Sequence, residues 1–197
     1  MPERKFMMAV LDDQWRGRNV LKMPETIDIG ILLLRRPRLT DIDAIFEYGS
    51  DQQVSYYADW KRLTDKTSLE SRLISRDEAW MDGTEYNWVI TEKVNDTAIG
   101  GLSCTIQDGK AEIGYLLNRK YWNRGYTTDV VKKVIGILVN DACVKSVWAT
   151  CDKDNAGSIR VLEKSGMKRE KLLKKFRVRP NISEKPRDAY LYIYRAV

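Results

Sequence analysis

The sequence contains no histidine, the side chain that most often moves protons near neutral pH. Ser-His-Asp and Cys-His catalysis are therefore excluded, and any acid–base step must use a carboxylate, Tyr, Lys, Ser, water or a cofactor group. Cysteine is scarce too: Cys104, Cys143 and Cys151 are an odd number and contain no Cys-x-x-Cys. A disulfide framework and a zinc site are both disfavoured, so we expect no metal.

Long apolar runs are also missing. No segment approaches the roughly 20 apolar residues that cross a bilayer. The short apolar stretch at residues 7–11 is followed at once by Asp12 and Asp13, unlike a secretory signal. We therefore expect a cytoplasmic protein that does not contact a membrane.

The composition is that of a folded domain. The 197 residues are 43% hydrophobic and 31% charged, which suits one soluble domain with a proper core. The net charge of +6, from 34 basic and 28 acidic residues, favours anionic ligands. No nucleic-acid-binding motif accompanies this charge, so a solvated basic surface is a better interpretation than direct nucleic-acid binding.

The stretch from residue 111 to 139 predicts a strand, a basic turn and a helix. Glu112 to Leu117 is rich in β-formers, residues 118–126 are turn-like, and apolar residues then recur with helical spacing. Thr127 or Thr128 is expected to cap the helix, with Asp129 in its first turn.

Such a strand–helix junction offers unpaired N–H groups and the positive end of a helix dipole. Gly125 has no Cβ, so an anion can approach the backbone closely. We therefore predict a phosphate or pyrophosphate site at residues 124–128. Neither Gly-x-x-x-x-Gly-Lys-Ser/Thr nor Gly-x-Gly-x-x-Gly occurs, and the stretch also suits an ordinary strand–helix connection.

The remaining pattern predicts an α+β domain with a mixed sheet. Turn residues at 95–96 and 108–109 join three strands into an antiparallel meander. The expected strands are 27–36, 87–92, 99–106, 112–117, 146–150, 167–178 and 189–194, and the expected helices are 40–49, 64–81, 127–139 and 155–165. Residues 180–186 are expected to form a loop, and residues 1–26 an N-terminal extension before a single domain at 27–197.

Three motifs in order carry a resemblance to a known family. They are Glu112-Ile-Gly-Tyr with Tyr121-Trp-Asn-Arg-Gly-Tyr-Thr-Thr-Asp, then Asn155-Ala-Gly-Ser-Ile-Arg-Val-Leu-Glu-Lys-Ser-Gly-Met, and, at the start of the domain, Leu34-Arg-Arg-Pro-Arg-Leu-Thr-Asp-Ile-Asp-Ala-Ile-Phe. Together they resemble the GNAT N-acetyltransferase superfamily, and within it the RimJ/RimL-like branch of ribosomal-protein N-terminal acetyltransferases.

The resemblance implies a mixed, mostly antiparallel sheet of six or seven strands, splayed at its central strands and flanked by about four helices. It implies direct transfer of acetyl from acetyl-CoA to an amine. The strand at 115–117 would part from the strand at 147–149, and the pantetheine arm would lie between them. The expected cofactor-binding residues are Leu116, Leu117, Asn118, Arg124, Gly125, Tyr126, Thr127, Thr128, Asn155 and Ser158.

Two side chains receive catalytic roles by the same resemblance. Glu112 matches the carboxylate base of several GNAT enzymes, although an exposed glutamate at a strand end is the alternative. Ser158 is the candidate that protonates or hydrogen-bonds the leaving thiolate, because Leu162 stands where many GNAT enzymes have tyrosine. Asn155 also suits a simple helix cap. Cys151 is expected near the cofactor sulfur or as a buried structural thiol.

The acceptor stays open at this point. Thr127, Asp129 and Met167 depart from the usual Gly or Ala, Glu and Phe of the branch, which loosens the tie to ribosomal-protein substrates. The expected partners are acetyl-CoA and an amine, either a protein N-terminus or a small molecule such as an aminoglycoside, bound by a monomer or a homodimer. A non-catalytic acetyl-CoA-binding module and a ribosome-associated basic protein are the other classes.

Overall fold

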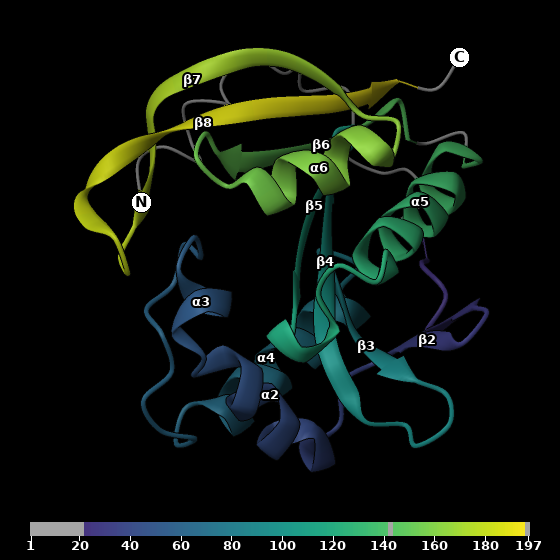
Figure 1. Ribbon diagram of the computed structural model, residues 1–197. Coiled ribbons are helices and arrows are strands. Elements are labelled where there is room, and N and C mark those ends of the chain that lie inside the picture. The colour runs from purple at the N-terminus through teal and green to yellow at the C-terminus, as the bar shows by residue number, and fades with distance from the viewer. Residues whose placement is uncertain (1–21, 142–143, 196–197) are drawn as a thin grey trace.

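The computed structural model describes residues 22–141 and 144–195, which form an α+β domain around one mixed sheet (Figure 1). The strand order is β1-β2-β3-β4-β5-β6-β8-β7, and all neighbours are antiparallel except β5 and β6. The strands are β1 (Thr26–Ile29), β2 (Leu32–Arg35), β3 (Glu85–Glu92), β4 (Ala98–Gln107), β5 (Lys110–Leu117), β6 (Ser146–Asp152), β7 (Lys168–Arg179) and β8 (Ser183–Arg195). The helices are α2 (Ile42–Gly49), α3 (Gln52–Ser55), α4 (Leu69–Met81), α5 (Tyr126–Val139) and α6 (Ala156–Lys164), with 3₁₀ turns at Leu39–Asp41 and Arg119–Tyr121.

The described part of the sheet has eight strands, one more than the upper prediction, because the expected first strand is a hairpin. Gly30 has φ 65° and its N–H donates to Asp28 Oδ1 at 3.1 Å, which turns the chain between β1 and β2. Glycine adopts a positive φ at little steric cost, so the chain reverses inside an otherwise continuous apolar run.

Three further boundaries differ from prediction. Residues 52–55 form the short helix α3, capped by Asp51, within a stretch expected to be irregular. Helix α4 begins at Leu69 rather than near residue 64, because the Asp65 side chain accepts the Thr67 N–H in a local turn. The expected loop at 180–186 is mostly strand. Pro186 is tolerated in β8 because it lies opposite Val178 of β7, beyond the residues that pair with β6.

The helices cover the sheet in two groups. Helices α2 and α4 pack on β3 and β4, whereas α5 and α6 pack on the strands around β6. Adjacent residues of β3 show that these groups lie on opposite faces: Val89 belongs to the α2–α4 cluster and Ile90 to the larger core with α5. Of the predicted extension, residues 1–21 lie outside the described residues, while Met23 is buried in the larger core.

The sheet opens at its centre. β5 pairs with β6 only through Lys110↔Ser146, Ala111↔Val147 and Glu112↔Trp148. Beyond that point β5 stays paired with β4 as far as Leu117, while β6 stays paired with β8 as far as Asp152. In Figure 1 the strands β6 to β8 cross the top of the view and β3 to β5 run down from it. The predicted splay is present, but it begins at Ala149, because residues 147 and 148 are still paired.

Candidate active site at the split sheet

A cavity of about 420 Å³ lies where the two halves of the sheet part. Its walls come from distant parts of the chain: β5 and β6 at the split, α6 on one side, α2 to α4 on another, and the end of β7. Of the predicted site residues, Glu112, Leu116 and Ser158 line this one cavity. The fold therefore brings both predicted catalytic side chains to the same space.

Glu112 is the last β5 residue that pairs with β6, so its side chain stands at the point where the strands separate. The side chain is 25% exposed, and Oε1 lies 3.5 Å from Arg177 Nη2. Arg177 also donates to Asp59 Oδ2 at 3.2 Å, which links the carboxylate to the loop that follows α3. This cavity-facing, ion-paired position differs from that of a glutamate on an open surface.

Tyr115 supplies a hydroxyl that sequence reasoning missed. Its oxygen lies 2.9 Å from Ser158 Oγ, and it donates to the Ser158 main-chain oxygen at 3.3 Å. Burial raises the pKa of Tyr115, so the phenol stays protonated at neutral pH. The absence of a tyrosine at position 162 could have prompted a search for a phenol elsewhere in the chain. In this structure the phenol belongs to Tyr115 on β5, and the fully buried Leu162 lines the cavity.

Cys151 is buried, and its thiol lies within hydrogen-bonding reach of Ser158. Burial raises the pKa of Cys151 to about 11, an effect that the Ser158 hydrogen bond partly opposes. The thiol is therefore uncharged at neutral pH. The expectation of a buried thiol is confirmed, whereas its position relative to the cofactor sulfur stays a prediction.

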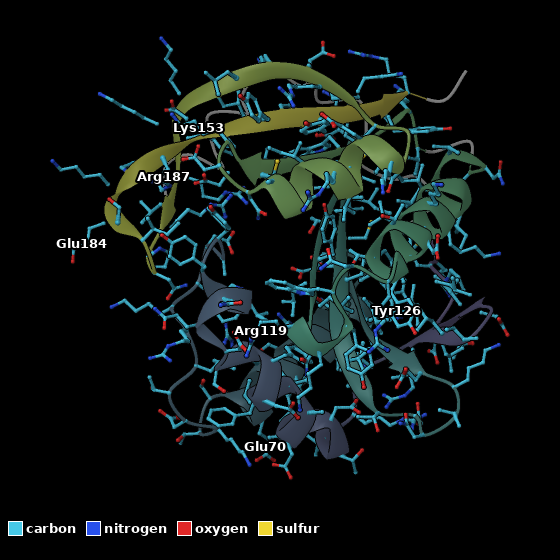
Figure 2. The ribbon with its side chains drawn as sticks, in the orientation of Figure 1. Glu70, Arg119, Tyr126, Lys153, Glu184 and Arg187 are labelled. Carbon is cyan, nitrogen blue, oxygen red and sulfur yellow. The ribbon has the colours of Figure 1, made fainter. Side chains whose placement is uncertain are left out.

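Helix α5 begins at Tyr126, with Gly125 at the cap position and φ 84°. The expectation that Thr127 or Thr128 caps the helix is wrong: both lie in its first turn, as does Asp129. Gly125 has no side chain that could accept a hydrogen bond from the first-turn N–H groups of α5. Within the described residues this helix therefore has no side-chain N-cap. Figure 2 labels Tyr126 at the start of α5.

The turn before α5 is held by its own contacts. Asn118 Oδ1 accepts the Lys120 N–H at 3.1 Å, and the Trp122 indole donates to the Leu117 main-chain oxygen at 2.8 Å. Arg119 and Lys120 form ion pairs with Asp51 and Glu47. Among the described residues Arg124 donates instead to the main-chain oxygen of residue 120, so its guanidinium is not neutralised by a carboxylate.

The edge of β5 that faces the split is set by strand alternation. The Asn118 N–H donates to Ile99 O of β4 at 2.7 Å. Because backbone groups alternate sides along a strand, the Leu116 N–H also points to β4, whereas that of Leu117 points toward the split. On the facing helix, Asn155 Oδ1 accepts the Ser158 N–H at 3.1 Å, which confirms that Asn155 caps α6.

Residues 57–60, in the loop that follows α3, form another wall of the cavity. Tyr57 donates through its hydroxyl to Asp154 O at 3.0 Å, which joins this segment to the start of α6. Asn181, in the β7–β8 turn, donates to Ser55 O at 2.7 Å and to Trp60 O at 2.9 Å. These bonds fix the wall from both neighbouring elements.

In the part of the chain that the structure describes, no three His, Cys, Asp or Glu side chains are grouped as metal ligands. No described helix is both long and apolar enough to cross a bilayer.

Comparison with known proteins agrees with this geometry. The acetyltransferase (GNAT) domain family matches residues 32–168. The chain is 28% identical over 155 residues to the uncharacterized N-acetyltransferase p20 of Bacillus licheniformis, covering 77% of this chain and 87% of that protein. A GNAT-family acetyltransferase structure from Bacillus anthracis aligns with a TM-score of 0.75 at 25% identity, covering 87% of this chain and 98% of that one.

The fold is also shared with a ribosomal-protein enzyme. The structure of RimL, a ribosomal L7/L12 alpha-N-protein acetyltransferase in complex with coenzyme A, aligns with a TM-score of 0.78. It is 17% identical, and the alignment covers 87% of this chain and 98% of RimL.

Proposed function

This chain belongs to the GNAT acetyltransferase family, and on that premise we propose that it transfers acetyl from acetyl-CoA to the N-terminal α-amine of a protein or peptide. The observation that carries this proposal is the split between β5 and β6, with Glu112 and Ser158 lining one cavity at its mouth. The relatives and the RimL structure support the reaction and the cofactor. They do not decide between a protein N-terminus and a small amine, so a small amine is the alternative acceptor.

The cofactor is held mostly by main-chain groups in this proposal. The first-turn amides of α5, at Tyr126 to Thr128, bind the pyrophosphate, and Gly125 allows close approach. Arg124 adds an unpaired positive charge beside them. The pantetheine arm lies in the split as an added strand, with the Nδ2 amide of Asn155 donating to it, because Oδ1 is already used by the helix cap.

The Leu117 N–H is the donor for the thioester oxygen, favoured over that of Leu116 by the strand alternation. Glu112 removes the proton from the attacking amine, directly or through one water. An α-amine has a pKa of about 7.7–8.0, so a carboxylate base suffices, whereas a lysine acceptor at about 10.4 would demand more.

The reaction balances without a metal or a covalent enzyme intermediate. The amine nitrogen forms a bond to the acetyl carbon, and the carbon–sulfur bond of the thioester breaks. The amine proton passes to Glu112. The departing thiolate takes a proton from the Tyr115–Ser158 hydroxyl pair, whose oxygens lie 2.9 Å apart. Coenzyme A then leaves as a free thiol.

Purified protein incubated with acetyl-CoA and a panel of amines tests this function. The panel contains N-terminal peptides, polyamines and aminoglycosides, and chromatography quantifies free coenzyme A and the acetylated product. We expect peptides with a free α-amine to be acetylated. Product from aminoglycosides or polyamines alone would favour the small-molecule reading, and coenzyme A binding without transfer to any amine would indicate a non-catalytic module.

Glu112→Gln tests the base. We expect unchanged coenzyme A affinity but turnover reduced by about 10²–10⁴, the usual contribution of a positioned base. The defect should be largest below the α-amine pKa and shrink at higher pH, because the amine then deprotonates without help. Glu70→Gln is the matched control, since Glu70 is exposed on α4 away from the cavity (Figure 2). Equal turnover of the Glu112 variant at every pH would remove Glu112 from the mechanism.

A further inference from the structure

The acceptor side of the cavity is unusually rich in arginine. Arg72 and Arg76 of α4 and Arg177 and Arg179 of β7 line it, together with the carboxylates of Asp59, Glu85 and Glu112. Arg177 is the shared partner of two of these carboxylates, Asp59 and Glu112. Glu85 accepts a hydrogen bond from Asn87 Nδ2 at 3.0 Å. The acidic groups of the cavity therefore leave part of its positive charge unmatched.

Two of the arginines lack ion-pair partners. Within residues 22–141 and 144–195, no carboxylate lies within 4.0 Å of the guanidinium of Arg76 or Arg179, and neither side chain donates a hydrogen bond. Arg179 is only 6% exposed. Burial lowers the pKa of Arg179 and the neighbouring charge of Arg177 lowers it further, while the carboxylates of Asp59 and Asp152, which lie beyond ion-pair distance, partly oppose this. The Arg76 side chain is exposed.

Arg35 shows how this fold treats an arginine that has only a structural role. It is 3% exposed, and its guanidinium binds both oxygens of Asp41 at 2.8 Å and Asp96 Oδ1 at 2.7 Å. A buried guanidinium without such partners costs several kcal/mol of desolvation. Arg179 carries part of that cost while facing a cavity, a pattern suited to binding an anion, and the exposed Arg76 lines the same cavity.

An independent observation points the same way. The hydroxyl of Thr150 is the one buried side-chain polar atom of the described residues that has no hydrogen-bond partner. Thr150 lines the same cavity as Arg179. It belongs to the part of β6 that no longer pairs with β5. Buried polar atoms are nearly always satisfied, so an orphaned hydroxyl in a cavity wall indicates a missing ligand oxygen.

We propose that the acceptor is a primary amine that carries a carboxylate, and that Arg179 binds this carboxylate while the amine reaches Glu112. The inference rests on the proposed function and narrows its acceptor class. The guanidinium fork of Arg179, with the Thr150 hydroxyl in the same cavity wall, suits the planar oxygens of a carboxylate, and the arginines that line the cavity repel polyamines and aminoglycosides. The carboxylate can come from an acidic N-terminal residue of a peptide or from a free amino acid.

Acceptor pairs with and without the anion test the proposal. The pairs are Asp-Ala-Ala-amide with Asn-Ala-Ala-amide, and free glutamate with glutaminamide, in which both carboxylates are amidated, each assayed at a pH where both amines of the pair are equally deprotonated or with the rates corrected for that fraction. Spermidine is the cationic reference. We expect kcat/KM for the carboxylate member to exceed its neutral partner by about tenfold or more, equivalent to ~1.4 kcal/mol. The pair with the larger advantage identifies the source of the carboxylate. Equal values within both pairs, or a preference for spermidine, would overturn the proposal.

Substitutions locate the anion site. Arg179→Gln should lower kcat/KM for the acidic acceptor by a larger factor than for its neutral partner, and so remove most of the advantage of the acidic acceptor. Arg179→Lys keeps the charge without the planar fork and should retain part of the advantage. Arg195→Gln is the matched control, because Arg195 is exposed and pairs with Glu170 outside the cavity. Equal loss on both acceptors in the Arg179→Gln variant would indicate a structural role and refute the assignment.

A binding measurement separates this inference from the proposed function. Glutarate should raise the thermal midpoint of the wild-type protein, uncharged glutaramide should not, and Arg179→Gln should abolish the effect. The ligand-free Arg179→Gln protein should also be at least as stable as wild type, because an unmatched buried charge has gone. A glutarate effect without transfer to any amine would refute the acetyltransferase assignment alone. No glutarate effect on wild type would refute the anion site, whatever the turnover.

Discussion

Replacing Tyr115 by phenylalanine removes one oxygen atom and leaves the ring that lines the cavity in place. The lost contacts are the 2.9 Å approach to Ser158 Oγ and the 3.3 Å hydrogen bond to Ser158 O. Loss of such a bond costs about 1 kcal/mol of stability, so the variant should fold normally. If the phenol helps to protonate the leaving thiolate, turnover should fall by about 10²–10⁴, far more than the stability effect.

The pH profile and a double variant make this reasoning specific. Because burial raises the Tyr115 pKa above its ordinary value, the wild-type phenol stays protonated across the assay range and adds no ionisation of its own below that value. Tyr115→Phe should therefore lower turnover without shifting the acidic limb. If Tyr115 and Ser158 act as one donor unit, the double variant with Ser158→Ala should be no slower than the slower single variant.

The assay is single-turnover acetyl transfer at saturating acetyl-CoA, with coenzyme A affinity measured separately by calorimetry. Tyr194→Phe serves as the control, since Tyr194 lies on β8 outside the cavity. A Tyr115→Phe rate within about twofold of wild type would reduce the phenol to packing and leave Ser158 as the sole donor candidate. Multiplying defects in the double variant would instead show that the two hydroxyls act independently.

Three further substitutions test the frame of the site. Gly100→Ala would place a Cβ 2.5 Å from the Leu116 main-chain oxygen, so we expect a loss of about 1–3 kcal/mol in denaturant unfolding and weaker coenzyme A binding. Gly125→Ala, at φ 84°, should cost about 1–2 kcal/mol and lower coenzyme A affinity; unchanged affinity would argue against the helix start as the pyrophosphate site. Burial raises the Asp152 pKa, but its bonds to Arg187 outweigh this and the net shift is downward. Its stabilising effect is then present above about pH 3.9 and lost as pH falls through the lower folded pKa, so Asp152→Asn should be less stable by about 2 kcal/mol at neutral pH and show a flatter acid unfolding curve.

Local signals were sufficient for much of the fold. Asp108 and Gly109 both have positive φ, at 52° and 73°, which confirms the hairpin turn that their residue types predict. Gly166, at φ 85°, ends α6 as expected. The split itself was expected only from the family resemblance, because pairing between β5 and β6 joins residues more than thirty positions apart. The Gly30 turn was readable in principle, but it was hidden within a continuous apolar run.

The parts of the site that sequence reasoning missed depend on contacts between distant segments. Tyr115 meets Ser158 from 43 positions away, and its direction depends on how α6 packs across the split. Arg76 and Arg179 belong to a helix and a strand that meet only around the cavity. Composition gave a net charge of +6, yet it could not show which arginines form ion pairs at the surface and which line the cavity without one.

The split also offers a physical reason why the proposed acceptor pocket is basic while the proposed cofactor site uses main-chain groups. One edge of β5 forms hydrogen bonds with β4, and one edge of β6 forms hydrogen bonds with β8. Beyond Glu112 and Trp148, the edges of β5 and β6 that face each other are therefore not paired with a strand. Unpaired strand edges near a core are costly unless another strand-like chain covers them, which a pantetheine arm does without any charged side chain. Under the proposed function, charge in the cavity is then free to serve the acceptor, and Arg179 at the end of β7 supplies part of it.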